Sequence, residues 1–158
     1  MKNILLDTTY ILPLFGIDVK IPGLKERILL MSEKYNLLIN SLSILEAKWK
    51  VLKLAKKHPN IIESFSEGLL FLTHREIFRI IPFYEYDVDL IAAELLKFHS
   101  DYFDCSILAS AIINADIFIT EEKERMHTLL CKLSSDYLIY RKMKSNLTII
   151  RLKEIDLK

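Results

Sequence analysis

The sequence has few of the residues that build special loops, cross-links or strongly charged surfaces. It holds three glycines and four prolines in 158 residues, so we expect short loops and no glycine-rich phosphate-binding loop. Its two cysteines, Cys105 and Cys131, are too few for a zinc pattern and are expected to be reduced, buried thiols. The net charge is +1, whereas proteins that coat nucleic acid by charge alone are usually more basic. Any contact with nucleic acid must therefore be local.

Long apolar runs are also absent. No run approaches the ~18 residues that a membrane-spanning helix needs, and the N-terminal residues lack the features of a signal peptide. We therefore expect a cytoplasmic protein without a membrane segment. Hydrophobic residues make up 51% of the chain and charged residues 27%, which suits a folded protein with one core. The length predicts a single domain over residues 1–158.

Short runs rich in isoleucine, leucine and phenylalanine alternate with longer segments of helical periodicity. The expected strands cover residues 3–6, 36–40, 77–83, 116–120 and 147–152. The expected helices cover residues 22–34, 44–57, 60–73, 86–99, 103–114, 123–132 and 134–144. The strands lack a clean polar alternation, as expected of strands buried on both faces. The pattern predicts an α/β fold, in three α/β/α layers around a central, mostly parallel five-stranded sheet.

Four acidic residues, distant in sequence, are expected at one edge of this sheet. They are Asp7 after the first strand, Glu46 in the helix after the second, Asp104 at a helix start, and Glu122 after the fourth strand. Ligands bind such sheets outside the carboxyl ends of the strands, where the strand order reverses. Crowded carboxylates repel one another unless a cation neutralises them, and Mg²⁺ or Mn²⁺ prefers oxygen ligands. Such an ion supports hydrolysis of a phosphodiester.

The motifs around these acids resemble those of the PIN-domain ribonucleases, including the VapC-type toxins. In the segment DCSILASAIINADIFITEE, an acid opens a helix with small residues, a strand ends in threonine, and an acid follows two positions later; these are Asp104, Thr120 and Glu122. The start of the chain is similar, with an apolar strand, Asp7 and then the hydroxyl residue Thr9. Glu46 stands in the helix after the second strand, as in the family. The resemblance runs from residue 3 to about residue 122.

The resemblance implies a PIN-like fold and a metal-dependent endoribonuclease. Catalysis would then rest on Asp7, Glu46, Asp104 and Glu122, with Mg²⁺ or Mn²⁺ held by Asp7, Asp104 and Glu122 and with Thr9 and Thr120 in support. The resemblance further implies RNA as substrate, an antitoxin protein as partner, and a homodimer. Lys48 and Lys50 are close enough to Glu46 in sequence to meet an RNA backbone.

Each of these residues also has a simpler structural interpretation. Asp7 and Thr120 are suitable helix N-caps, and Ser43 with Glu46 fits a capping box. Asp104 would favour the helix dipole, although Asp101 is an equally good cap. The remaining residues suit a solvated or packing role: Glu121 as a solvated acid, His99 as an exposed helix-end histidine, Trp49 as a packing residue, and the lysines of residues 48–57 as a solvated face.

Two other functions are compatible with the sequence. Glu122 stands where the PIN family more usually has aspartate or asparagine, which favours a non-catalytic PIN scaffold that binds RNA or protein. A phosphatase of the haloacid-dehalogenase kind also has an aspartate after its first strand. That chemistry needs a second aspartate two positions later, where this chain has Thr9.

Overall fold

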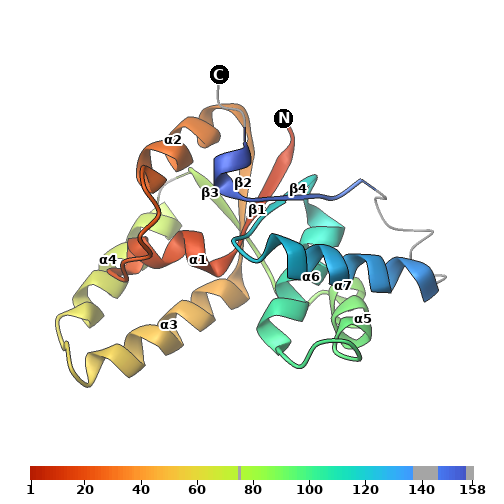
Figure 1. The fold of residues 1–158 in the computed structure, drawn as a ribbon. Coiled ribbons are helices and arrows are strands. Elements are labelled where there is room, and N and C mark those ends of the chain that lie inside the picture. The colour runs from red at the N-terminus through yellow and green to blue at the C-terminus, as the bar shows by residue number, and fades with distance from the viewer. Residues whose placement is uncertain (75, 137–145, 156–158) are drawn as a thin grey trace.

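A computed structural model gives the fold and describes residues 1–74, 76–136 and 146–155 (Figure 1). Within these residues five strands form one sheet in which every neighbouring pair is parallel. The strands are β1 (Asn3–Leu6), β2 (Asn36–Asn40), β3 (Phe78–Ile81), β4 (Ile117–Ile119) and β5 (Thr148–Ile150). Their order is β3-β2-β1-β4-β5. The expected five-stranded parallel sheet is confirmed.

The expected helices are present in the described residues, with ends shifted by a few positions. They are α2 (Leu24–Lys34), α3 (Ser41–Ala55), α4 (Ile61–His74), α5 (Tyr86–Leu95), α6 (Tyr102–Asn114) and α7 (Lys123–Asp136). Three short helices lie outside the expected ranges: α1 (Thr8–Ile11), whose start agrees with Asp7 as a helix N-cap, and the 3₁₀ helices η1 (Leu12–Phe15) and η3 (Leu152–Glu154). Of the helix expected at 134–144, the first three residues belong to α7, and the rest lies outside the described residues.

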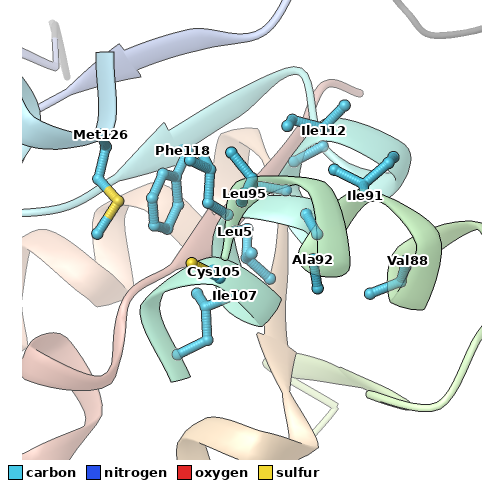
Figure 2. Close-up of a cluster of buried hydrophobic side chains, with 14 of the residues drawn as sticks. Leu5, Val88, Ile91, Ala92, Leu95, Cys105, Ile107, Ile112, Phe118 and Met126 are labelled. Atoms are coloured by element: carbon cyan, nitrogen blue, oxygen red, sulfur yellow. The ribbon is translucent and has the colours of Figure 1, made fainter. Parts of the chain in front are cut away.

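Both faces of the sheet are covered, because side chains alternate between the faces of a strand. Leu5 of β1 points into a buried cluster with α5, α6 and α7, in which Phe118 and Met126 also lie (Figure 2). Ile4 and Leu6 point the other way, into a cluster with α1 to α4. The three-layer arrangement expected from the sequence is therefore confirmed.

The two cysteines differ from the expectation in one respect. Both are thiols, as expected, and Cys105 is buried among the side chains of α5, α6 and α7, whereas Cys131 is exposed on α7. Burial raises the pKa of the Cys105 thiol to about 11, so this thiol stays protonated. No helix in the described part of the chain is long and apolar enough to cross a membrane.

The helix α4 packs closely against η1, and a glycine makes this possible. A Cβ atom on Gly68 would lie 2.1 Å from the carbonyl oxygen of Leu14. Gly16 ends η1 with φ +80°, a backbone conformation that suits glycine. Together these residues fix the segment that follows β1, which begins at Asp7.

The strand order places the switch point between β1 and β4. From β1 the chain adds β2 and β3 on one side and then returns to place β4 on the other side of β1. The backbone N–H of Asp7 donates to the carbonyl of Ile119, which extends the pairing of β1 with β4 by one residue. The ends of these two strands therefore lie side by side, where α/β proteins bind their ligands.

Candidate functional site

Asp7 stands at the centre of the candidate site and is hydrogen-bonded through both carboxylate oxygens. Its Oδ1 accepts from the backbone N–H of Thr8 at 2.7 Å, which makes Asp7 the N-cap of α1. Its Oδ2 accepts from the hydroxyl of Thr120 at 2.7 Å. The capping interpretation of Asp7 is confirmed, and the bond to Thr120 adds a contact across the switch point.

The surroundings of Asp7 oppose its ionisation. Burial raises the pKa of its carboxyl to about 6, although the hydrogen bonds from Thr120 and Thr8 act in the opposite direction. The negative charges of Asp104 and Glu46 raise this pKa further. Three of the four acids selected from the sequence are thus close enough to interact electrostatically, as expected of a carboxylate cluster.

Glu46 reaches the site from α3, and the alternative interpretation of Ser43 and Glu46 as a capping box is wrong. The helix begins at Ser41, and its N-cap is Asn40, whose side chain accepts from the N–H of Leu42 at 2.7 Å. Glu46 therefore lies inside the helix. Its Oε2 accepts from the hydroxyl of Thr8 at 2.5 Å, and its Oε1 pairs with Lys50 at 2.7 Å. Thr8 thereby joins Glu46 to the segment that carries Asp7.

Asp104 is free of a capping role because Asp101 performs it. The side chain of Asp101 accepts from the N–H groups of Phe103 and Asp104 at 2.9 and 3.2 Å. The Oδ2 of Asp104 lies 3.0 Å from Nε2 of His99 and 2.5 Å from Nη2 of Arg125. His99 is thus a partner of the site and not the exposed helix-end residue expected from the sequence.

Glu122 lies at the outer rim of the site. Its N–H donates to the Thr120 hydroxyl at 3.1 Å, and its half-exposed side chain pairs with Arg125. Arg125 therefore joins Glu122 to Asp104. The neighbouring Glu121, expected to be merely solvated, accepts a 2.5 Å hydrogen bond from the Tyr10 hydroxyl. Burial and this glutamate raise the pKa of Tyr10.

Two contributors to the site were missed from the sequence, and one supporting role lacks a contact. Among the described residues, Thr9 donates no side-chain hydrogen bond; the hydroxyl that reaches an acid of the cluster from this segment is that of Thr8. The position of Thr8, directly after Asp7, is the signal for it. Arg125 was also missed, although its place three residues after Glu122 on a helix indicates an ion pair.

The lysines and the tryptophan of α3 lie beside this cluster. Lys48 is exposed, as a surface contact to RNA would require, whereas Lys50 is engaged with Glu46. Trp49 is 60% exposed, so the packing role expected for it is wrong. The Nζ of Lys53 lies 5.3 Å from the centre of its ring. The helix that carries Glu46 therefore also presents an exposed aromatic ring beside the positive charge of Lys53.

The donor atoms of the cluster are of the kind that a hard divalent cation prefers, since all four acids offer carboxylate oxygens. In this arrangement, however, basic side chains already balance part of the negative charge. Lys50 pairs with Glu46, and Arg125 pairs with Asp104 and Glu122. No three His, Cys, Asp or Glu side chains in the described ranges are grouped as a metal site. The four acids thus have the donor atoms that Mg²⁺ or Mn²⁺ needs, but three of their side chains are turned towards Lys50 or Arg125.

Comparison with known proteins identifies the fold. No family model matches the sequence, and no curated protein matches it. One solved structure that is similar is that of VapBC2 from Rickettsia felis bound to a DNA fragment from their promoter. The two chains are 18% identical with a TM-score of 0.59, over 94% of this chain and 98% of that chain. The similarity spans the whole arrangement of strands and helices, and the fold of this protein is therefore the PIN-like α/β fold.

Proposed function

We propose that this protein is a metal-dependent endoribonuclease of the PIN type. The observation that carries the proposal is the link between Asp7 and Thr120 across the switch point, with Glu46 and Asp104 near enough to raise the pKa of Asp7. Carboxylates that repel one another at the carboxyl ends of parallel strands are typical of functional sites. The motifs that resemble the PIN ribonucleases contain these same residues.

Each residue has a distinct part in this proposal. Asp7, Asp104 and Glu122 would hold Mg²⁺ or Mn²⁺, which supplies an activated water and stabilises negative charge on the phosphate. Thr120 holds the Asp7 carboxylate in place, since its hydroxyl donates to Oδ2. Thr8 does the same for Glu46. The exposed Lys48 would contact the phosphates of the RNA backbone. Lys50, which pairs with Glu46, would contact them at the edge of the acidic cluster.

The proposal extends to partners. The similar structure is a VapBC2 complex, and the VapC name agrees with the VapC-type toxins that the motifs resemble. We therefore propose that an antitoxin protein restrains this enzyme, and that the enzyme forms a homodimer. Exposed apolar side chains on α3, Leu45, Trp49 and Leu52, recur on one helix face and support a protein contact there.

A second function, a PIN scaffold without catalysis, is favoured by one observation. Arg125 already pairs with both Asp104 and Glu122, so that these two acids have a partner without any metal ion. In that case the protein would bind RNA or another protein through its surface, and Asp7 would serve as the cap of α1 alone.

Cleavage of RNA by the purified protein tests the two functions against each other. We expect cleavage with Mn²⁺ or Mg²⁺, none with a chelator, and a loss of at least about a hundredfold in Asp7→Asn and Asp104→Asn. The matched control is Asp101→Asn, the same chemical change at a nearby helix cap, which should keep the activity of the wild type. Cleavage that survives both site variants would exclude the proposed site, and binding of RNA without cleavage would support the scaffold.

A further inference from the structure

Arg125 pairs with two acids of the site that lie far apart in the sequence. Its Nη2 atom lies 2.5 Å from Oδ2 of Asp104 on α6 and also pairs with Oε2 of Glu122, which follows β4. One guanidinium nitrogen thus bridges two of the carboxylates that the proposed function assigns to a metal ion. It stands between acids that would otherwise repel each other.

The position of Arg125 is fixed by the packing of its helix. Met126, the next residue, is buried in the cluster that contains Phe118 (Figure 2). The N–H of Met126 donates to the carbonyl of Glu122 at 3.0 Å, which closes the first turn of α7. Because Met126 anchors this turn to the sheet, the Arg125 side chain stays within reach of both acids.

Two other cations in the described part of the chain, Lys123 and Arg151, have different partners. Lys123 pairs with Glu154 at 2.6 Å, and Arg151 pairs with Glu124 at 2.6 Å. Lys123 belongs to the same helical turn as Arg125, yet its ammonium group pairs with Glu154 of η3. The two carboxylates are thus bridged by a particular residue and not by a general excess of positive charge.

We propose that Arg125 is an internal counter-cation, which holds Asp104 and Glu122 together in the metal-free protein and must leave them before a divalent ion can bind. The inference rests on the proposed function, since it assumes that these acids bind the ion. A metal ion gains their oxygens only by breaking two partly exposed ion pairs. The bridge therefore weakens metal binding and makes the free site electrostatically stable.

Calorimetric titration with Mn²⁺ tests this role without any measurement of activity. We expect Arg125→Gln to bind Mn²⁺ about three- to tenfold more tightly than the wild type, from the loss of two competing, partly exposed ion pairs. Lys123→Gln, which removes the same charge from the same helical turn, is the matched control and should change the affinity less than about twofold. Arg125→Lys keeps a competing charge and should stay close to the wild type.

Thermal unfolding supplies an independent readout. With a chelator, Arg125→Gln should melt below the wild type because Asp104 and Glu122 then repel each other, and Mn²⁺ should raise its melting temperature more than that of the wild type. If the wild type binds Mn²⁺ and Arg125→Gln binds it equally or more weakly, the counter-cation role is wrong while the proposed function stands. If neither protein binds Mn²⁺, the metal-dependent function fails, and this inference fails with it.

Discussion

The hydroxyl of Thr120 donates a 2.7 Å hydrogen bond to Oδ2 of Asp7, although the two residues are 113 positions apart in the chain. The bond joins the ends of β1 and β4, the two strands that flank the switch point. Thr120 is fully buried, and its oxygen also accepts from the N–H of Glu122 at 3.1 Å. Thr120 thus orients the carboxylate of Asp7 and also holds the backbone of Glu122.

Removal of this hydroxyl should be costly. Thr120→Val keeps the shape of the side chain but leaves Oδ2 of Asp7 and the N–H of Glu122 without this partner, so we expect a loss of about 1–3 kcal/mol in the free energy of unfolding at pH 7.5. Chemical denaturation measures it. Thr120→Ser retains the hydroxyl and should lose clearly less. A valine variant as stable as the serine variant would mean that the hydrogen bond contributes nothing.

The raised pKa of Asp7 predicts how the stability of the metal-free protein changes with pH. Its ordinary pKa is 3.8 and its folded value is about 6, so the folded state holds the proton more tightly than the unfolded state. The contribution of Asp7 to stability therefore falls as the pH rises from about 4 to 6 and is constant above that. Asp7→Asn, which retains a capping side chain, should be more stable than the wild type by about 1–3 kcal/mol at pH 7.5.

The same comparison at pH 4 supplies the control for Asp7. There the wild-type carboxyl is largely protonated in the folded state, so the advantage of Asp7→Asn should nearly vanish. Asp101→Asn changes an exposed cap in the same way and should show no gain at either pH. Denaturant titrations with a chelator present measure all three proteins. An Asp7→Asn variant that is less stable than the wild type at pH 7.5 would contradict the unfavourable environment assigned to this carboxylate.

Trp49 offers a direct optical test of whether RNA or a protein binds its face of α3, because it is the sole tryptophan of the chain and is 60% exposed. Single-stranded RNA that stacks on its ring should quench its fluorescence, and Trp49→Ala should bind about tenfold more weakly. Trp49→Phe keeps an aromatic ring and should bind closer to the wild type. RNA that binds without quenching would place the interface elsewhere. A blue shift that depends on protein concentration alone would indicate contact between copies.

Gly68 allows a test of the packing that holds the Asp7 segment. Alanine is the better helix former, by about 1 kcal/mol in an open helix, yet its Cβ would lie 2.1 Å from the carbonyl oxygen of Leu14. We expect Gly68→Ala to lower the free energy of unfolding by about 1–3 kcal/mol. Ser66→Ala on the exposed side of α4 should change it by less than about 0.5 kcal/mol. A stabilised Gly68→Ala variant would show that the two segments separate easily.

The three-layer arrangement and the edge of the sheet that holds the acids were predictable, because both depend on the hydrophobic pattern of short segments. Apolar runs such as 3–6 and 36–40 are typical of buried strands at this length, and helices between them favour parallel pairing. Asp7 after a strand and Asp104 in a first helical turn follow from the same periodicity. The capping role of Asp101 was also predictable, since a residue of this type suits the position before a helix.

The partners of the acids were not predictable in the same way. Ser43 and Glu46 match a capping box, but Asn40 caps α3 instead and starts the helix earlier, so Glu46 is left to accept from Thr8. Trp49 has an apolar side chain, yet its helix turns Ala47 and Val51 to the core and leaves the ring outside. Such outcomes depend on which face of each helix meets the sheet.

The sequence by itself determined the parallel α/β fold and the four acids expected at one of its edges, since hydrophobic periodicity and strand ends are local properties of the chain. Only the tertiary structure decided that Thr120 bonds to Asp7, that Thr8 and not Thr9 reaches Glu46, and that Arg125 bridges Asp104 and Glu122. These contacts join residues far apart in the sequence or depend on the direction of a side chain. Their geometry exists only once the strands are ordered and both faces of the sheet are packed.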